Sequence, residues 1–217
     1  MSRRAVLDYK NRMTQPPQID PRVRSSVESA IATMELLRAD ASLLSTISRV
    51  AQSIIQAFRQ HNKILLFGNG GSATDAQHIA AEFVGRFAFD RPALPAISLT
   101  DSHSSLTAIS NDHGFEQVFS RQIEALAQPG DVAIAISTSG NSPNILHAVA
   151  TANHAKLLTV GLTGRSGGKL RSVAQECICV PSDETPRIQE CHTLVGHIIS
   201  EIVEQELFGR KNSAAQS

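Results

Sequence analysis

The sequence predicts an α/β fold, a three-layer sandwich in which a five-stranded parallel sheet lies between helices, with additional N-terminal helices. Apolar runs with the composition of buried strands lie near residues 63–67, 95–99, 131–137, 157–162 and 176–181. Helical patterns separate these runs, and such alternation of strands and helices is typical of a parallel sheet covered on both faces. The chain has 217 residues, 41% of them hydrophobic, which is enough for one sizeable core.

Residues from about 20 to 60 are predicted to form two helices that are broken near Asp40. Apolar residues repeat there with helical spacing: Val27, Ile31, Met34, Leu37, Leu43, Leu44, Ile47, Val50, Ile54 and Phe58. These apolar stripes exceed what a sheet already flanked by helices needs, so we expect the N-terminal helical segment 1–60 to serve in symmetric self-association. The sequence assigns no clear role to residues 1 to about 20, which include the polar stretch Gln15-Pro16-Pro17-Gln18.

The predicted α/β domain spans residues 61–208. Its helices are expected near residues 72–87, 103–111, 115–127, 143–154 and 167–174, and a closing helix from about 186 to 208. The polar tail 209–217 is predicted to be disordered. Ligands of such sheets bind outside the carboxyl ends of the strands, so the loops at that edge are the candidate functional segments.

Composition excludes several classes of function. The formal net charge is zero and the pI is about 7.1, so no global basic field favours nucleic acid or an anionic membrane surface. Neither an apolar run of about 18 residues nor a charged-then-apolar leader is present, so we expect a cytoplasmic protein. The segment ECICV predicts a buried strand in which Cys177 and Cys179 act as small hydrophobes, and Cys191 is expected to serve in packing.

The first candidate loop follows the strand at 63–67 and has the sequence GNGGS. Its glycines permit positive φ and close approach of the backbone to a ligand, and Ser72 is expected to open the next helix. His78 and Glu82 stand at i and i+4 on that helix, so both side chains project from one face. A tight turn followed by a surface contact is the alternative interpretation, because short glycine loops are weak motifs.

The second candidate loop follows the strand at 131–137. Its hydroxyls lie beside the amides that begin the next helix, a setting that suits phosphate oxygens, and they belong to Ser137, Thr138, Ser139 and Ser142. Pro143 suits the first turn of that helix. The loop lacks the Gly-Lys-Ser/Thr of a Walker motif, and its serines could be simple helix caps. Two such junctions in one short chain favour a phosphorylated small molecule as the ligand.

The closing helix contributes the remaining candidates. Gln189 and His197 are eight residues apart, about 80° around the helix at ~100° per residue, so they share a broad face. His192 lies roughly 140° from His197 and is interpreted as structural. Imidazole and carboxylate ligands suit zinc, and the candidate set is His78, Glu82, Gln189 and His197.

These motifs together resemble the sugar isomerase (SIS) domain, a flavodoxin-like fold, and within it the phosphoheptose isomerases, also called sedoheptulose 7-phosphate isomerases. The resemblance runs from about Lys63 to Phe208 through GNGGS, DAQHIAAEF, ISNDHGF, ISTSGNS, LTGRSGGKL and RIQECHTLVGH. It implies a cytoplasmic homotetramer with one Zn²⁺ per subunit, bound by His78, Glu82, Gln189 and His197. It also implies Glu82 and His197 as the catalytic acid/base pair. The substrate contacts that it implies are Asn69, Gly70, Gly71, Ser72, Glu82, Asn111, Asp112, Ser137, Thr138, Ser139, Ser142 and Gln189.

The implied reaction converts D-sedoheptulose 7-phosphate to D-glycero-D-manno-heptose 7-phosphate through an enediol, the first step of nucleotide-activated heptose biosynthesis. A carboxylate can move the carbon-bound proton and an imidazole the oxygen-bound proton, while zinc polarises the oxygens. The alternative is a non-catalytic SIS tetramer that binds a replication initiator protein. Relatives of that type typically lack the glutamate and the final histidine, and this chain has both Glu82 and His197. A sugar-phosphate-sensing regulator is disfavoured because no basic recognition helix is present.

Overall fold

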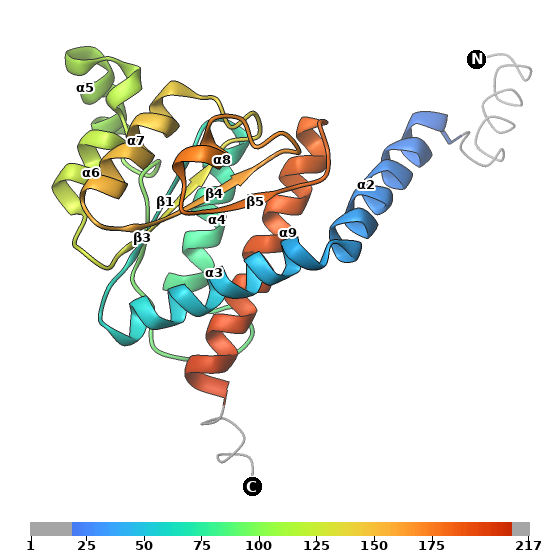
Figure 1. The fold of residues 1–217 in the computed structure, drawn as a ribbon, viewed down its shortest axis with the longest axis horizontal. Coiled ribbons are helices and arrows are strands. Elements are labelled where there is room, and N and C mark those ends of the chain that lie inside the picture. Colours follow the sequence, from blue (N-terminus) through green and yellow to red (C-terminus); the bar gives the residue numbers. More distant parts are fainter. Residues whose placement is uncertain (1–18, 210–217) are drawn as a thin grey trace, which may run out of the picture.

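A five-stranded, all-parallel sheet forms the centre of the protein in the computed structural model, which describes residues 19–209 (Figure 1). The strands are β1 (Ile64–Gly68), β2 (Ala96–Ser98), β3 (Val132–Ile136), β4 (Leu158–Thr163) and β5 (Glu176–Cys179). Their order across the sheet is β2-β1-β3-β4-β5, so the chain leaves β1 for β2 at one edge and returns to β3 on the other side of β1. The carboxyl ends of β1 and β3 therefore flank the point where the strand order reverses, which is the usual ligand site of such sheets.

Helices cover both faces of this sheet, which confirms the predicted three-layer architecture. One face of β3 presents Val132, Ile134 and Ile136 to α3 (Ala41–Arg59), α4 (Gly71–Val84) and α9 (Thr185–Glu204). The other face presents Ala133 and Ala135 to the layer that contains α6 (Ser120–Leu126), α7 (Pro143–His154) and α8 (Leu170–Val173). Because β3 is buried on both faces, its sequence is a continuous apolar run.

The predicted break near Asp40 is confirmed. Helix α2 (Pro21–Ala39) ends there and α3 begins, with Asp40 Oδ1 accepting hydrogen bonds from Ser42 N and Leu43 N, each at 3.0 Å. Asp20 caps α2 in the same way, accepting from Arg22 N at 2.9 Å. Residues 1–18, which contain most of the polar lead-in, lie outside the described residues.

Two predicted helices differ from the structure. The segment expected as one helix over residues 115–127 is a 3₁₀ turn (Phe115–Gln117) followed by the short α6. Gly114, at φ 88°, ends the preceding helix α5 (His103–His113). The closing helix is regular only to Glu204 and then widens into a π-helical turn (Gln205–Gly209). The predicted tail lies outside the described residues from 210 onward.

Helix α2 stands away from the body of the molecule (Figure 1). A row of exposed apolar side chains starts just before it and runs along it at helical spacing, comprising Ile19, Val23, Val27, Ile31 and Met34. We call this row the α2 stripe. In the described part of the chain, no helix is both long enough and apolar enough to cross a bilayer.

The expectation that Cys177 and Cys179 are buried is wrong. Both side chains are only partly buried, whereas Ile178 between them is fully buried. Strand β5 forms the edge of the sheet, so its two faces meet different surroundings. Ile178 packs in the core cluster with α3 and α9, and the cysteines project on the opposite side, where the layer is completed by the four-residue α8.

Candidate active site

Two polar loops lie side by side where β1 and β3 end. Gly68 is paired with Ile136 in the sheet, so the segments that follow these residues emerge together. Gly70 has φ 56° and ψ −123° and precedes α4, which begins at Gly71. This positive φ is one that glycine adopts readily and other residues do not. Ser72 was expected to open the helix but is its second residue, and its side chain is buried.

The loop after β3 makes no side-chain capping hydrogen bond to α7. Ser142 precedes α7 without accepting a capping hydrogen bond, and its Oγ instead lies 3.3 Å from Ser137 Oγ. Ser139 Oγ accepts from Asn141 N at 3.2 Å. A cap would consume the Ser142 hydroxyl at the helix N-terminus, so this arrangement favours the phosphate-binding interpretation over the capping one.

A pair of asparagines joins the two loops. Asn69 Nδ2 donates to Asn144 Oδ1 and Asn144 Nδ2 donates to Asn69 Oδ1, both at 2.9 Å. Asn144 is buried and was not predicted as a site residue, although its place in GNSPN, one residue past the proline, could have suggested it. The reciprocal amide pair makes the two loops one rigid unit, because loss of either partner would leave buried amide groups unsatisfied.

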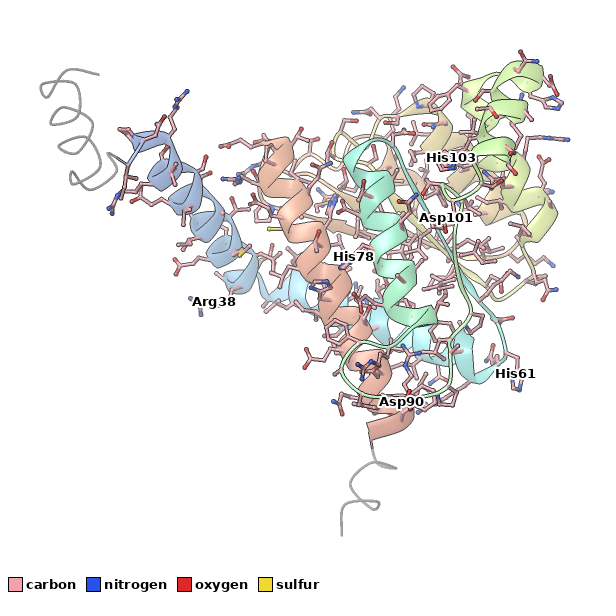
Figure 2. The ribbon with its side chains drawn as sticks, turned by 180° about the vertical axis from the view of Figure 1, so that it is seen from behind. Arg38, His61, His78, Asp90, Asp101 and His103 are labelled. Atoms are coloured by element: carbon pink, nitrogen blue, oxygen red, sulfur yellow. The ribbon has the colours of Figure 1, made fainter. Side chains whose placement is uncertain are left out.

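A pocket of about 290 Å³ opens beside the first loop. Its lining includes Gly68, Asn69 and Gly70 from the loop, Thr100 from the segment after β2, and His103 from the first turn of α5 (Figure 2). The pocket lies at the carboxyl edge of the sheet, where the topology predicts a ligand.

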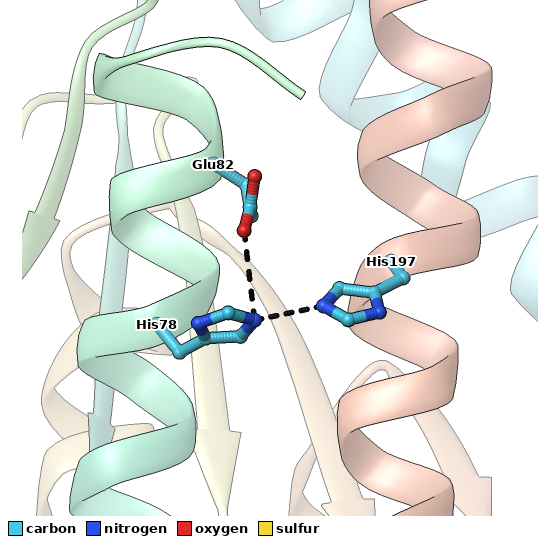
Figure 3. A group of neighbouring side chains, drawn as sticks. All are labelled: His78, Glu82 and His197. Carbon is cyan, nitrogen blue, oxygen red and sulfur yellow. Dashed lines mark hydrogen bonds and ion pairs between the residues drawn. The ribbon is translucent and has the colours of Figure 1, made fainter. Parts of the chain in front are cut away.

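The two predicted histidines and the glutamate converge between α4 and α9 (Figure 3). His78 Nε2 lies 2.7 Å from His197 Nε2 and 3.5 Å from Glu82 Oε1, and the two imidazole rings meet edge to face at 5.0 Å. Close approach of the helices makes this possible, since a Cβ at Gly196 would overlap the Ile79 side chain. Figure 2 places His78 where the two helices meet.

This cluster has the donor set of a zinc site. In the described residues, His78, Glu82 and His197 are the one group of histidine, cysteine and acidic side chains whose ligand atoms all lie within 4.8 Å of one another. Two imidazole nitrogens and a carboxylate oxygen are typical ligands of catalytic zinc, which keeps a further position open. The chemistry of the residues therefore fits such an ion.

Gln189 of α9 reaches the first residue of α4. Its side-chain amide packs against Gly71, the first residue of α4. Gln189 therefore links the first loop to the face of α9 that carries His197. Its membership of the metal set stays a prediction.

Asp75 lies between the loop and the imidazoles and was not predicted from the sequence. Its Oδ1 accepts from Thr193 Oγ1 of α9 at 3.2 Å, and its Oδ2 is buried without a hydrogen-bond partner among the described residues. Burial raises the pKa of this carboxyl, and the Thr193 bond and the His78 charge oppose that rise. Asp75 thus places a carboxyl with a raised pKa one turn before His78.

A buried ion pair holds the end of α4 against the end of α9. Glu204 accepts from Phe87 N at 2.8 Å, from Ala88 N at 2.7 Å and from Arg91 Nε at 3.0 Å. Arg91 in turn donates to the backbone carbonyl of Glu82 at 2.7 Å. The loop after α4 and the backbone of the catalytic candidate Glu82 are therefore fixed by one network, which the sequence did not reveal.

Asn111 and Asp112, which were predicted as substrate contacts, lie neither in the cluster of His78, Glu82 and His197 nor in the lining of the loop pocket. Asn111 Nδ2 donates to Asp112 Oδ1 at 2.7 Å, and both side chains are exposed on α5. Their position follows from α5, which lies on the other side of the loop pocket from α9 (Figure 1). A role for them in substrate contact stays a prediction.

The structure supports the structural interpretation of His192 and Cys191. His192 is fully buried, its Nε2 lies 3.3 Å from the Thr163 carbonyl oxygen, and burial lowers the pKa of its imidazole to about 4. Cys191 is also buried in the core, and burial raises the pKa of its thiol. Neither group belongs to the cluster of His78 and His197.

Comparison with known proteins agrees with this architecture. The family model of the SIS domain matches residues 28–164. The phosphoheptose isomerase of Aneurinibacillus thermoaerophilus is 52% identical over 87% of this chain and 96% of its own length, and that of Burkholderia pseudomallei (strain 1710b) is 50% identical over the same shares. The structure of the phosphoheptose isomerase GmhA from Neisseria gonorrhoeae superposes with a TM-score of 0.80 at 39% identity, covering 85% of this chain and 98% of that one. The chain therefore belongs to the SIS domain family and, within it, to the phosphoheptose isomerases, a family of sugar-phosphate isomerases.

Proposed function

We propose that the protein converts D-sedoheptulose 7-phosphate to D-glycero-D-manno-heptose 7-phosphate through an enediol, as the first step of nucleotide-activated heptose biosynthesis. The observation that carries the proposal is the convergence of Glu82 and His197 from two helices, with His78 between them. This group lies farther along α4 and α9, away from the loops that suit a phosphate. One end of a sugar phosphate could therefore be held while the other end reacts.

Glu82 and His197 divide the proton transfers of this reaction. A ketose becomes an aldose when a proton leaves C1, one is delivered to C2, and a proton moves between the two oxygens. Glu82 suits the carbon-bound proton, since its carboxylate has a second oxygen that does not face His78. His197 suits the oxygen-bound proton, because an imidazole can accept and donate near neutral pH.

We propose that His78, Glu82, Gln189 and His197 hold one zinc ion per subunit. When bound, zinc supplies Lewis acidity toward the carbonyl and enediolate oxygens of the sugar. The residues of the chain position those oxygens, and Phe87 packs against the His197 ring at 5.6 Å, which limits its rotation.

The phosphate end of the substrate is assigned to the joined loops. In this proposal the donors are the N-terminal turn of α4 and the hydroxyls of Ser137, Thr138, Ser139 and Ser142, of which Ser137 Oγ and Ser142 Oγ lie 3.3 Å apart before α7. The helix dipoles add a favourable field for an anion there. Asn69, Gly70, Gly71 and Ser72 supply the opposite wall in this proposal, with His103 in reach of the same pocket.

Incubation of the purified full-length protein with sedoheptulose 7-phosphate, with heptose 7-phosphate detected by chromatography, tests the proposed activity. Glu82→Gln and His197→Asn are expected to lower kcat by about 10²–10⁴-fold, which is the usual contribution of general acid–base catalysis. Glu124→Gln and His154→Asn, at exposed positions on α6 and α7, are the matched controls. Full turnover by either site variant would transfer the proton role to another group, with His103 and His113 the first to test.

Metal analysis tests the zinc assignment separately from turnover. Protein purified without chelator is expected to hold about one zinc-type ion per chain, and His78→Ala is expected to lose it. Fully active protein that contains no metal would refute the assignment. A folded protein with bound zinc and no turnover would instead favour the alternative of a non-catalytic SIS scaffold that binds a replication initiator.

We further propose that the α2 stripe is covered by other copies of the chain in a homotetramer. Four residues of the stripe, Ile19, Val23, Val27 and Ile31, are each more than half exposed and recur every four residues. An apolar row of this length is costly to leave in water, and symmetric self-association is the commonest way to cover it. The 1–60 segment would then serve in oligomerisation.

A further inference from the structure

The two partly buried cysteines of β5 form a thiol pair outside the proposed active site. Cys177 Sγ and Cys179 Sγ lie 3.7 Å apart, on the same side of the edge strand. Both line a solvent-open pocket of about 320 Å³, together with Arg165, Arg171 and the start of α3. The pair is therefore in contact with itself and reachable by a small reagent.

The surroundings make one of the two thiols reactive. When one proton is lost, the remaining thiol can donate to the thiolate, and this contact lowers the pKa of Cys179 to about 7, with further lowering by the Arg171 charge. The same contact raises the pKa of Cys177, and burial raises it further. An accessible, acidic thiol beside a second thiol is the usual arrangement of redox-sensitive cysteines.

A metal site is a weaker explanation of this pair. The group His78, Glu82 and His197 is the one three-ligand cluster of its kind in the described residues, so no third histidine, cysteine or acidic ligand joins the two thiols. Structural zinc almost always takes four protein ligands. Two sulfurs in an open pocket would leave such an ion half in water.

We propose that Cys177 and Cys179 are a reversible modification site that small hydroperoxides oxidise to an intramolecular disulfide. The Cys179 thiolate attacks the hydroperoxide, its S–O bond forms as the O–O bond breaks, and an alcohol or water leaves with one proton. Cys177 then attacks the sulfenic sulfur of Cys179, the S–S bond forms, and water leaves. Each turnover oxidises two thiols by two electrons and reduces one hydroperoxide.

The strand geometry predicts that this disulfide is easily reduced. Alternate residues of a strand lie about 6.6 Å apart at Cα, near the upper end of the range that a disulfide spans. The cross-link closes a very short loop, so it adds little chain-entropy stabilisation and strains β5. Strained and exposed disulfides are the labile ones.

Intact-mass spectrometry of the full-length protein after treatment with stoichiometric hydrogen peroxide tests the proposal. The expected product has lost two hydrogen atoms, maps to one peptide that contains Cys177 and Cys179, and returns to the starting mass with dithiothreitol. Cys177→Ser is expected to stop at sulfenic or sulfinic acid, because the resolving thiol is absent. Cys191→Ser is the matched control and should behave as the unsubstituted protein, since Cys191 is buried.

The rate of attack on the hydroperoxide, which is the first step, shows which of the two thiols is the nucleophile. At pH 7 a pKa of about 7 raises the thiolate fraction by roughly tenfold or more over that of an ordinary cysteine. A thiolate of lower pKa is also a weaker nucleophile, so the net increase in the rate of attack on the hydroperoxide is about threefold. In Cys177→Ser the serine hydroxyl can donate to the Cys179 thiolate in place of the thiol. Cys179→Ser should therefore react at least about threefold more slowly than Cys177→Ser, and Arg171→Gln should slow the unsubstituted pair. Equal rates in both serine variants, or peroxide-treated protein in which both thiols remain free for alkylation, would overturn the proposal. Zinc retained by the pair in His78→Ala would overturn it in favour of a metal site.

Discussion

Substitution of Glu204 by glutamine is expected to destabilise the protein strongly. The Glu204 carboxylate and the Arg91 guanidinium are 1% and 2% exposed, and the carboxylate accepts three hydrogen bonds at 2.7–3.0 Å. In Glu204→Gln an amide NH₂ faces a donor, and the Arg91 charge loses its buried counter-ion. Breaking a buried pair from one side costs about 3–5 kcal/mol.

The expected shift in melting temperature follows from the size of the chain. At roughly 2.1 cal/mol/K per residue, 217 residues give an unfolding entropy of about 0.46 kcal/mol/K. A loss of about 3–5 kcal/mol then lowers Tm by roughly 7–11 °C. Glu206→Gln is the matched control, because its ion pair with Arg59 is 3.0 Å long but about half exposed on both sides and contributes about 0–1 kcal/mol.

Acid sensitivity provides a second readout of the same network. Burial raises the pKa of Glu204, but the hydrogen bonds from Phe87 and Ala88 and the contact with Arg91 outweigh it and lower the pKa overall. The contribution of a carboxylate with a lowered folded-state pKa is present above its unfolded-state pKa and is lost as the pH falls through the folded-state value. Glu204→Gln should therefore lose less stability between neutral pH and acid than the unsubstituted protein.

Calorimetry and chemical unfolding of both variants, at one protein concentration, measure the effect. Activity should fall in Glu204→Gln as well, since Arg91 also binds the Glu82 carbonyl. If Glu204→Gln melts within about 2 °C of Glu206→Gln and unfolds with the same pH dependence as the unsubstituted protein, the network does not hold the helix ends together.

Three further expectations address the loops, the assembly and a buried histidine. Asn144→Ala should raise KM for the phosphorylated sugar about tenfold, because the pair with Asn69 is worth about 1–3 kcal/mol, and an unchanged KM in steady-state kinetics would count against a joined-loop site. Ile31→Asp should dissociate the proposed homotetramer in light scattering while Ser25→Asp on the same helix does not, and a tetramer that survives Ile31→Asp would contradict the assignment of the α2 stripe. The pKa of His192 is lowered to about 4 in the folded protein. The contribution of the neutral imidazole to the free energy of unfolding is therefore complete above the unfolded-state pKa of about 6.5 and declines as the pH falls toward 4. His192→Leu should reduce the stability lost between pH 7 and pH 4.5 by about 2–3 kcal/mol, measured by chemical unfolding, and an unaltered pH profile would show that His192 is not held neutral.

Local patterns in the sequence were sufficient for the architecture. Apolar runs predicted the five strands within one or two residues at their ends, because strands of a parallel sheet covered by helices are mostly apolar. The break at Asp40 followed from the helical periodicity of the apolar residues on either side of it. The position of His78 and Glu82 on one face of α4 followed from the helical repeat alone.

The convergence of His197 on that pair was not a consequence of spacing. His197 lies 119 residues after His78, and the sequence grouped it with that pair only by the chemistry of its side chain and by the resemblance to a family. The contact exists because Gly196 lets α9 approach Ile79 on α4 closely. Helix packing of this kind depends on which side chains meet across a long separation, and periodicity does not encode it.

Tertiary structure alone decided the supporting contacts and the exposure of the cysteines. The pairs Asn69–Asn144 and Arg91–Glu204 join segments 75 and 113 residues apart, so no local signal could assign the partners. The run ECICV reads as a buried strand, but its place at the edge of the sheet leaves one side only partly buried. The sequence by itself determined which segments form strands, helices and polar loops, because those depend on neighbours along the chain. The folded structure decided which side chains meet and which stay in water, because that depends on the order of the strands and on the packing of helices against them.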